Sequence, residues 1–246
     1  MPADTSLGWT DIAPLPNRLF AEGLGTALLV AAVVGSGIMA HTLSPSDTGL
    51  QLLENAVATG AALVVLIATL GPISGAHFNP VVTLVDAWFG GIRRREVAPY
   101  VVVQVVGACI GAMLANVMFG LSVVSISTHD RTGPGILLSE VVATFGLLLV
   151  ILGLVRGGRS EWIAPAVAAY IVAAYWFTAS TSFANPAVTV GRTLSNTFAG
   201  IAPASVPAFV VAQLIGGVVA VGATVLLWPR HSLRRPVAID VVEETR

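Results

Sequence analysis

The sequence has few charged residues and no lysine. Charged side chains make up 10% of its 246 residues, against about a quarter in soluble domains, so an ordinary soluble globular protein is excluded. The net charge of −1 gives no bulk basicity, and nucleic acid is therefore not an expected partner. The single cysteine, Cys109, cannot form an intrachain disulfide or supply a metal cluster.

Long apolar runs take the place of the missing charge. Hydrophobic residues make up 55% of the chain and the mean hydropathy is +0.86. A membrane-spanning helix needs about 20 largely apolar residues. Six stretches meet this need and predict an all-α, multi-pass membrane protein with the lipid bilayer as a partner: 19–41, 55–72, 97–120, 136–155, 162–180 and 205–228. The first stretch is too long for the apolar core of a signal peptide and is interrupted by Glu22, so we expect it to be retained.

The arginines divide between the two sides of the predicted membrane. With six spans, ten lie on one side: Arg18, Arg93, Arg94, Arg95, Arg156, Arg159, Arg230, Arg234, Arg235 and Arg246. Only Arg131 and Arg192 lie on the other. Positive residues favour the cytoplasmic side, which predicts that both termini are cytoplasmic in the inner (plasma) membrane.

The second half of the chain repeats features of the first. The segment SGAHFNPVVTL at 74–84 corresponds to STSFANPAVTV at 180–190, and EGLGT at 22–26 corresponds to EVVAT at 140–144. Each copy, about 18–120 and 136–228, contains three spans. Because three is odd, the second copy must cross the membrane upside down, as in the inverted repeats of many transporters.

The two Asn-Pro pairs predict short helices inside the membrane. Asparagine is a favoured N-cap and proline suits the first helical turn, so Asn79-Pro80 and Asn185-Pro186 should begin helices over 80–89 and 186–196. Neither helix is long enough to span a bilayer. We expect re-entrant segments, since irregular backbone at this depth must line a cavity or be buried in protein.

Half-helices that enter from opposite faces would meet at their N-termini. The partial positive charge of each N-terminus would then oppose cations and protons in a narrow pore. The predicted midplane site therefore comprises Asn79, Pro80, Val81, Asn185, Pro186 and Ala187. The alternative is that each Asn-Pro pair is an ordinary loop turn, which the extended repeat disfavours.

Two carboxylates and one histidine have competing interpretations. A carboxylate within an apolar span carries a high free-energy cost, so Glu22 and Glu140 each need a role. They either carry protons or sodium, or accept hydrogen bonds from the re-entrant loops. Their matched placement favours the structural role. We expect His77 to support its loop, with a protonation switch as the alternative. Asp86 should lie toward the cytoplasmic end and pair with an arginine.

These residues and motifs resemble the major intrinsic protein family of aquaporins and aquaglyceroporins. The resemblance covers about residues 18–228 and implies a right-handed bundle of six transmembrane helices with two re-entrant half-helices. A single channel domain would then be flanked by cytoplasmic segments at 1–17 and 229–246. The resemblance also implies a homotetramer and passive conduction of small neutral solutes, with no enzymatic activity, cofactor or metal.

The sequence departs from the family at the outer constriction. Members place an arginine after the second Asn-Pro-Ala, where this chain has Val188. Spacing carries the other constriction positions to Thr59, Ala173 and Ser182, which implies a wide filter without an aromatic wall. Arg192, four residues after Val188 and on the same helix face, either reaches back to the outer pore or meets loop carbonyls and water.

A wide, weakly polar filter suits glycerol-like polyols and uncharged arsenite or antimonite, with some water. The stretch from Asn185 to Leu194 resembles a bacterial aquaglyceroporin subgroup associated with arsenic resistance. Four alternatives remain: a water-selective aquaporin, an ion-coupled secondary transporter relying on Glu22 and Glu140, a membrane enzyme, and a purely structural membrane protein, which would not explain the paired helix caps. No HExxH spacing or Gly-rich phosphate loop supports the enzyme.

Overall fold

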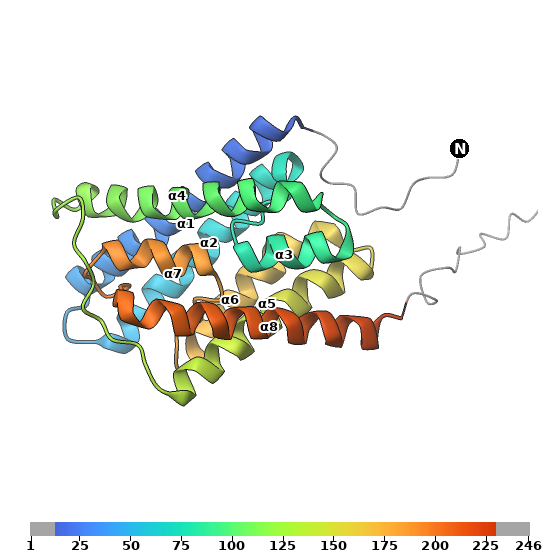
Figure 1. Ribbon diagram of the computed structural model, residues 1–246. Coiled ribbons are helices and arrows are strands. Elements are labelled where there is room, and N and C mark those ends of the chain that lie inside the picture. The colour runs from blue at the N-terminus through green and yellow to red at the C-terminus, as the bar shows by residue number, and fades with distance from the viewer. Residues whose placement is uncertain (1–12, 230–246) are drawn as a thin grey trace, which may run out of the picture.

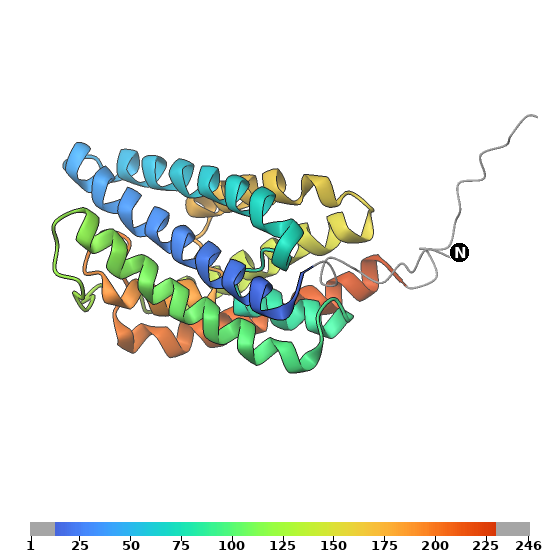
Figure 2. The ribbon, with the colours of Figure 1, turned by 90° about the horizontal axis from the view of Figure 1, so that it is seen from above.

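A computed structural model describes residues 13–229. All regular secondary structure in this range is helical, and the helices form one elongated bundle (Figures 1 and 2). Its α-helices are α1 (Leu15–Leu43), α2 (Thr48–Ser74), α3 (Pro80–Phe89), α4 (Arg94–Met118), α5 (Pro134–Arg156), α6 (Ile163–Phe177), α7 (Pro186–Gly191) and α8 (Val206–Leu227). Short 3-10 turns are η1 (Ser160–Trp162), η2 (Arg192–Leu194) and η3 (Pro203–Ser205).

The long helices match the predicted spans. Within residues 13–229, five helices are long and apolar enough to cross a membrane. The fifth predicted span, 162–180, is the exception, because α6 has 15 residues. It ends at Phe177, where the chain turns into the second re-entrant loop. With α6 as the shorter fifth span, the chain has the predicted six transmembrane helices and two half-helices, and this fold is confirmed.

The bundle has two distinguishable ends (Figure 1). We call the end where α1 begins and α8 ends the terminal end, and the end that holds the segment 119–133 the loop end. Arg18, Arg93 to Arg95, Arg156 and Arg159 lie toward the terminal end, whereas Arg131 and Arg192 lie toward the loop end. The four arginines from Arg230 onward, and most of both predicted flanking segments, lie outside the described residues.

Small residues let the long helices approach closely. A side chain at Gly107 or Gly111 of α4 would collide with the backbone of Gly23 or Ala27 of α1. Gly216 of α8 is similarly close to the backbone of α5 in the second half. Close packing of this kind drives helix association in membranes, where the hydrophobic effect between helices is weak.

The two short helices lie between the long ones and run toward opposite ends of the bundle (Figure 1). α3 has the predicted bounds, but α7 ends at Gly191 instead of 196. The carbonyls of Thr193 and Leu194 accept hydrogen bonds from the backbone of Ser127 and Ser125, at 2.8 and 3.0 Å. Contacts with the segment 119–133 thus replace the bonds that would continue the helix.

Candidate functional site: a pore between two half-helices

The Asn79 and Asn185 side chains meet where α3 and α7 begin. The Asn79 Oδ1 accepts from the Val81 N–H at 3.0 Å, and the Asn185 Oδ1 accepts from the Ala187 and Val188 N–H groups at 2.9 and 3.3 Å. These bonds satisfy N–H groups that a helix start leaves unpaired. The half-helices therefore point their N-termini at each other, as the repeat predicts.

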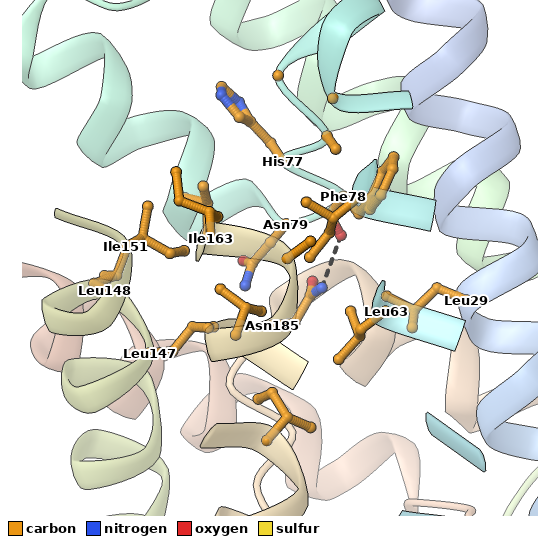
Figure 3. A pocket seen from close by; sticks show the side chains of 18 of the residues that line it. Leu29, Leu63, His77, Phe78, Asn79, Leu147, Leu148, Ile151, Ile163 and Asn185 are labelled. Atoms are coloured by element: carbon orange, nitrogen blue, oxygen red, sulfur yellow. Dashed lines mark hydrogen bonds between the residues drawn. The ribbon is translucent and has the colours of Figure 1, made fainter. Parts of the chain in front are cut away.

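The same two amides tie the re-entrant loops together. The Asn79 Nδ2 donates to the Ala184 carbonyl at 2.7 Å. The Asn185 Nδ2 donates to the Phe78 carbonyl, also at 2.7 Å (Figure 3). A primary amide has two N–H donors. One hydrogen on each nitrogen is thus used within the protein, and the other is available to a solute in the cavity that both asparagines line.

The re-entrant loops hold strained backbone at matched positions. Ala76 and Phe78 before Asn79, and Ser182 and Ala184 before Asn185, all have φ between 48° and 51°. A non-glycine residue in this left-handed region costs on the order of 1–3 kcal/mol. Such conformations persist only where surrounding bonds hold them.

Glu22 supplies those bonds in the first half. Its Oε1 accepts from the Ser74 hydroxyl at 2.7 Å and the His77 N–H at 2.9 Å. Its Oε2 accepts from the Phe78 N–H at 2.7 Å and the Gln104 Nε2 at 2.8 Å. The carboxylate is fully buried and does not line the pore cavity.

Glu140 has the matching role in the second half. It accepts from the Phe183 and Ala184 N–H groups, each at 2.9 Å, and from the Gln213 Nε2 at 2.7 Å. Gln213 also donates to the Thr189 hydroxyl at 2.9 Å. Because both carboxylate oxygens of Glu140 accept hydrogen bonds from the protein, Glu140 is placed to fix the backbone of the re-entrant loop and not to carry an ion.

Sequence reasoning missed the two glutamines. Gln104 donates to Thr83 as well as to Glu22, at 2.9 Å, and so matches the bonds of Gln213. Each glutamine is an isolated polar residue within an apolar helix, in the runs VVVQVV and VVAQLI. A polar residue in such a setting usually has a specific partner, and this signal was available in the sequence.

A cavity of about 400 Å³ runs between the two halves. It reaches Phe89 and Glu161 at the terminal end and Arg192 at the loop end, passing Asn79 and Asn185. Figure 3 shows leucine and isoleucine side chains of the long helices on the sides that face the asparagines. The lining is thus largely apolar, with polar groups provided chiefly by the re-entrant segments.

Thr59 lies on the cavity wall, but Ala173 does not. Ala173 is exposed on the outer side of α6, so the expectation that it lines the constriction is wrong. Tyr175, two residues later, is buried and lines the cavity. Its hydroxyl lies 3.2 Å from the Thr59 hydroxyl. An aromatic side chain therefore lines the cavity beside Thr59, where spacing alone predicted none.

The other predicted constriction residues also border the cavity. Ser182, Val188 and Arg192 are buried and contribute to the lining. The Ser182 Oγ is buried without a hydrogen-bond partner among the described residues. The Arg192 Nε donates to the Ala199 carbonyl, and its guanidinium carbon lies 3.4 Å from the centre of the Phe183 ring.

The terminal mouth of the cavity carries a histidine and a carboxylate. The His77 Nε2 lies 3.5 Å from Asp86 Oδ2, and its Nδ1 lies 3.1 Å from the Thr83 hydroxyl. The expected pairing of Asp86 with an arginine is therefore not observed. Asp86 lies on α3 seven residues, or about two helical turns, after Asn79, and there its carboxylate faces His77.

The fold and cavity define a membrane channel formed by two inverted re-entrant half-helices. The sequence pattern of the family described as Major intrinsic protein matches residues 12–181, and the chain belongs to this family. It is therefore a multi-pass membrane channel for small neutral solutes, and not an enzyme. The coupled-transporter alternative loses its basis in the same geometry, because neither Glu22 nor Glu140 lines the cavity.

Individual relatives agree with this assignment. The chain is 56% identical over 206 residues to aquaglyceroporin AqpS of Rhizobium meliloti, covering 84% of this chain and 88% of that protein. It is 31% identical over 228 residues to aquaporin Z of Bradyrhizobium diazoefficiens, covering 86% and 92%. The aquaglyceroporin structure from Plasmodium falciparum has a TM-score of 0.67 at 21% identity, covering 85% and 95%, and so supports the fold.

Proposed function

We propose that this protein is an aquaglyceroporin-type channel that passively conducts glycerol-like polyols and neutral trivalent metalloid hydroxides such as arsenite and antimonite, with some water. The observation that carries the proposal is the two-sided cavity lining. One side offers the Asn79 and Asn185 amides and the re-entrant backbone, and the other offers leucine, isoleucine and valine side chains. A polyol has hydroxyl groups and a carbon chain, and both can be matched at once in such a pore.

The constriction favours the same solutes. Val188 occupies the position of the usual arginine without charge or hydrogen-bond donors, while Thr59 and Tyr175 place two hydroxyls on the opposite helices. Hydroxyls exchange donor and acceptor roles freely, so they can follow a polyhydroxylated solute as it turns. The relative named aquaglyceroporin adds support for this solute class.

The direct test is stopped-flow light scattering on proteoliposomes with water, glycerol and arsenite gradients. Glycerol and arsenite should enter well above the rate of empty vesicles. Val188→Arg should slow glycerol by about tenfold, equivalent to about 1.4 kcal/mol in the barrier, while water flux remains measurable. Val188→Leu is the matched control, because it adds bulk without charge. Unchanged glycerol and arsenite entry in Val188→Arg would contradict the placement of residue 188 in the constriction.

A water-selective channel is the second candidate. The Tyr175 side chain lines the cavity with its hydroxyl 3.2 Å from that of Thr59, and a bulky aromatic ring in the constriction favours the smallest solute. If only water crosses the wild-type protein, this second function is correct and the polyol proposal fails.

Three further assignments concern the channel domain, the oligomeric state and the orientation in the membrane. We infer that residues 18–228 form one channel domain and that four copies assemble, each with its own pore. The arginines at the terminal end favour a cytoplasmic location for that end in the inner membrane, which makes the loop end the outer mouth. Protease accessibility in sealed vesicles tests the orientation, and the mass of the detergent-solubilised protein tests the tetramer.

A further inference from the structure

The inverted repeat places a matched pair of side chains at each mouth of the pore. His77 and Phe183 each lie two residues before the asparagine of their motif, and Asp86 and Arg192 each lie seven residues after it. All four line the cavity. His77 contacts Asp86 at one mouth, and Phe183 contacts Arg192 at the other. The same geometry therefore places the Asp86 carboxylate at the terminal end and the Arg192 guanidinium at the loop end.

Phe183 forms a fixed platform at the loop end. Its N–H donates to Glu140 at 2.9 Å, and its ring packs edge-on against Phe209 with centroids 5.3 Å apart. Glu140 is fully buried and Phe209 is fully buried. A guanidinium resting on this ring is consequently held at a defined place in the pore.

The Arg192 guanidinium is bound to the protein through its Nε, whereas its Nη groups have no protein acceptor among the described residues. Its Nε is bound by the Ala199 carbonyl and its guanidinium lies over the Phe183 ring. Among residues 13–229, the bond from its Nε is the one hydrogen bond found for this side chain, and no ion pair to a carboxylate is found. Because the side chain is only 2% exposed and lines the cavity, the Nη donors are directed to the pore contents.

A second arginine approaches the same ring from the loop 119–133. The Arg131 guanidinium carbon lies 5.1 Å from the Phe183 centroid. Its Nε donates to the Gly200 carbonyl at 2.9 Å and its Nη2 to the Phe198 carbonyl at 3.4 Å. Two cations thus share one aromatic ring, and the carbonyls of one short segment, 198–200, hold both of them.

We propose that Arg192 and Arg131, positioned by Phe183, form the charge filter of the outer mouth and take over the role of the arginine that is missing at position 188. Two guanidinium groups near one ring, in a site of low dielectric, strongly repel any cation that enters the pore. The free Arg192 donors and the unpartnered Ser182 hydroxyl, which also lines the cavity, bind the acceptor oxygens of neutral hydroxylated solutes. An unneutralised buried cation is costly in a membrane protein, which argues against a merely structural arginine.

This inference rests on the proposed function for its solutes but makes a separate claim about ions. The test measures two fluxes on the same proteoliposomes. Glycerol and water entry are followed by light scattering, and proton and sodium leak under an imposed potassium diffusion potential are followed with an internal dye. The variants are Arg192→Gln, Arg192→Lys and Arg131→Gln.

Arg156→Gln is the matched control at the opposite end. The Arg156 guanidinium lies 5.0 Å from the centre of the Phe89 ring, so it reproduces the arginine–phenylalanine contact. Like Arg131, Arg156 does not itself line the cavity, but its ring partner Phe89 lies at the terminal end of the cavity, away from Arg192. Its replacement should leave both the solute fluxes and the cation leak unchanged.

Arg192→Gln should raise the cation leak by about tenfold, because it removes the charge at the outer mouth. The rise should not be larger, because the half-helix barrier at the midplane stays in place. Arg131→Gln should raise the leak less, since Arg131 is farther from the ring. Arg192→Lys should keep cations out while slowing glycerol, because a lysine keeps the charge but loses the planar donor set. Adding Val188→Arg to Arg192→Gln should restore cation exclusion.

A normal cation barrier in Arg192→Gln, with glycerol flux intact, would overturn the charge filter. If Arg192→Gln does not assemble, the leak in Arg131→Gln alone decides, and an unchanged leak there also overturns it. A wild-type protein that excludes cations but admits neither glycerol nor arsenite would instead refute the proposed function and leave the charge filter standing.

Discussion

The two re-entrant segments share one design but differ in how firmly they are held. Glu22 accepts four hydrogen bonds in the first half, whereas Glu140 accepts three in the second. α3 continues for 10 residues and ends at Gly90 in the left-handed conformation, while α7 ends after 6 and passes into a 3-10 turn. An inverted repeat thus preserves the caps at the midplane and lets the two mouths diverge.

The divergence between the two segments falls at the two mouths of the cavity. The first segment ends in the longer and more regular of the two short helices, with a histidine–aspartate contact at the terminal mouth. The second gives up helical bonds to the segment 119–133 and gains Arg192 and Arg131 around Phe183. Regular structure at one mouth and irregular structure at the other lets selectivity change without disturbing the midplane.

The carboxylates offer the strongest test of this comparison. Glu22→Gln should destabilise the protein more than Glu140→Gln, because an amide replaces a charged acceptor of four bonds in one case and three in the other. The difference should be about one charge-assisted hydrogen bond, roughly 1.5–3 kcal/mol, read as a lower thermal unfolding midpoint in detergent. Glu140→Gln should retain part of its glycerol conduction. Complete loss of conduction by a correctly folded Glu140→Gln would revive a coupled-transport role for the carboxylate.

Tyr175 provides a smaller effect confined to the second half. Tyr175→Ala should widen the constriction and raise glycerol flux relative to water, by about threefold to tenfold. Tyr175→Phe isolates the hydroxyl facing Thr59 and should change the flux less. Ala173→Ser is the control on the outer side of α6 and should leave the flux unaltered. A change in selectivity from residue 173, with none from residue 175, would return the filter to the position that spacing predicts.

The midplane caps should give the smallest difference between the segments. Asn79 caps one N–H and Asn185 caps two, and loss of an N-cap typically costs about 0.5–2 kcal/mol. Asn185→Ala should therefore lower the unfolding midpoint slightly more than Asn79→Ala. The comparison is made by thermal unfolding of the two single variants in one detergent. Equal midpoints would show that the cross-loop bonds to Ala184 and Phe78 dominate both sites.

Features that depend on local chemistry were predictable from the sequence. The six spans follow from apolar length, and the start of each half-helix follows from an asparagine cap with proline at the first turn. The matched Glu22 and Glu140 could be assigned to the loops because a membrane interior leaves a carboxylate few other stable roles. Gln104 and Gln213 had the same kind of signal and were overlooked.

Features that depend on where a helix ends were not predictable. The bounds of α6 decide that Tyr175 faces Thr59 and Ala173 faces outward, and an apolar helix without a landmark does not reveal its rotation. The early end of α7 depends on Ser125 and Ser127, which lie more than 60 residues away in the chain. The pairing of Asp86 with His77 likewise depends on the fold of the first re-entrant loop.

The sequence by itself determined the class of molecule, because apolar length, paired helix caps and an inverted repeat each have one physical solution in a bilayer. Only the tertiary structure decided the composition of the constriction and the position of Arg192 on Phe183. A side chain in a pore is selected by the rotation of its helix and by partners from distant segments, and neither is encoded in the local sequence around it.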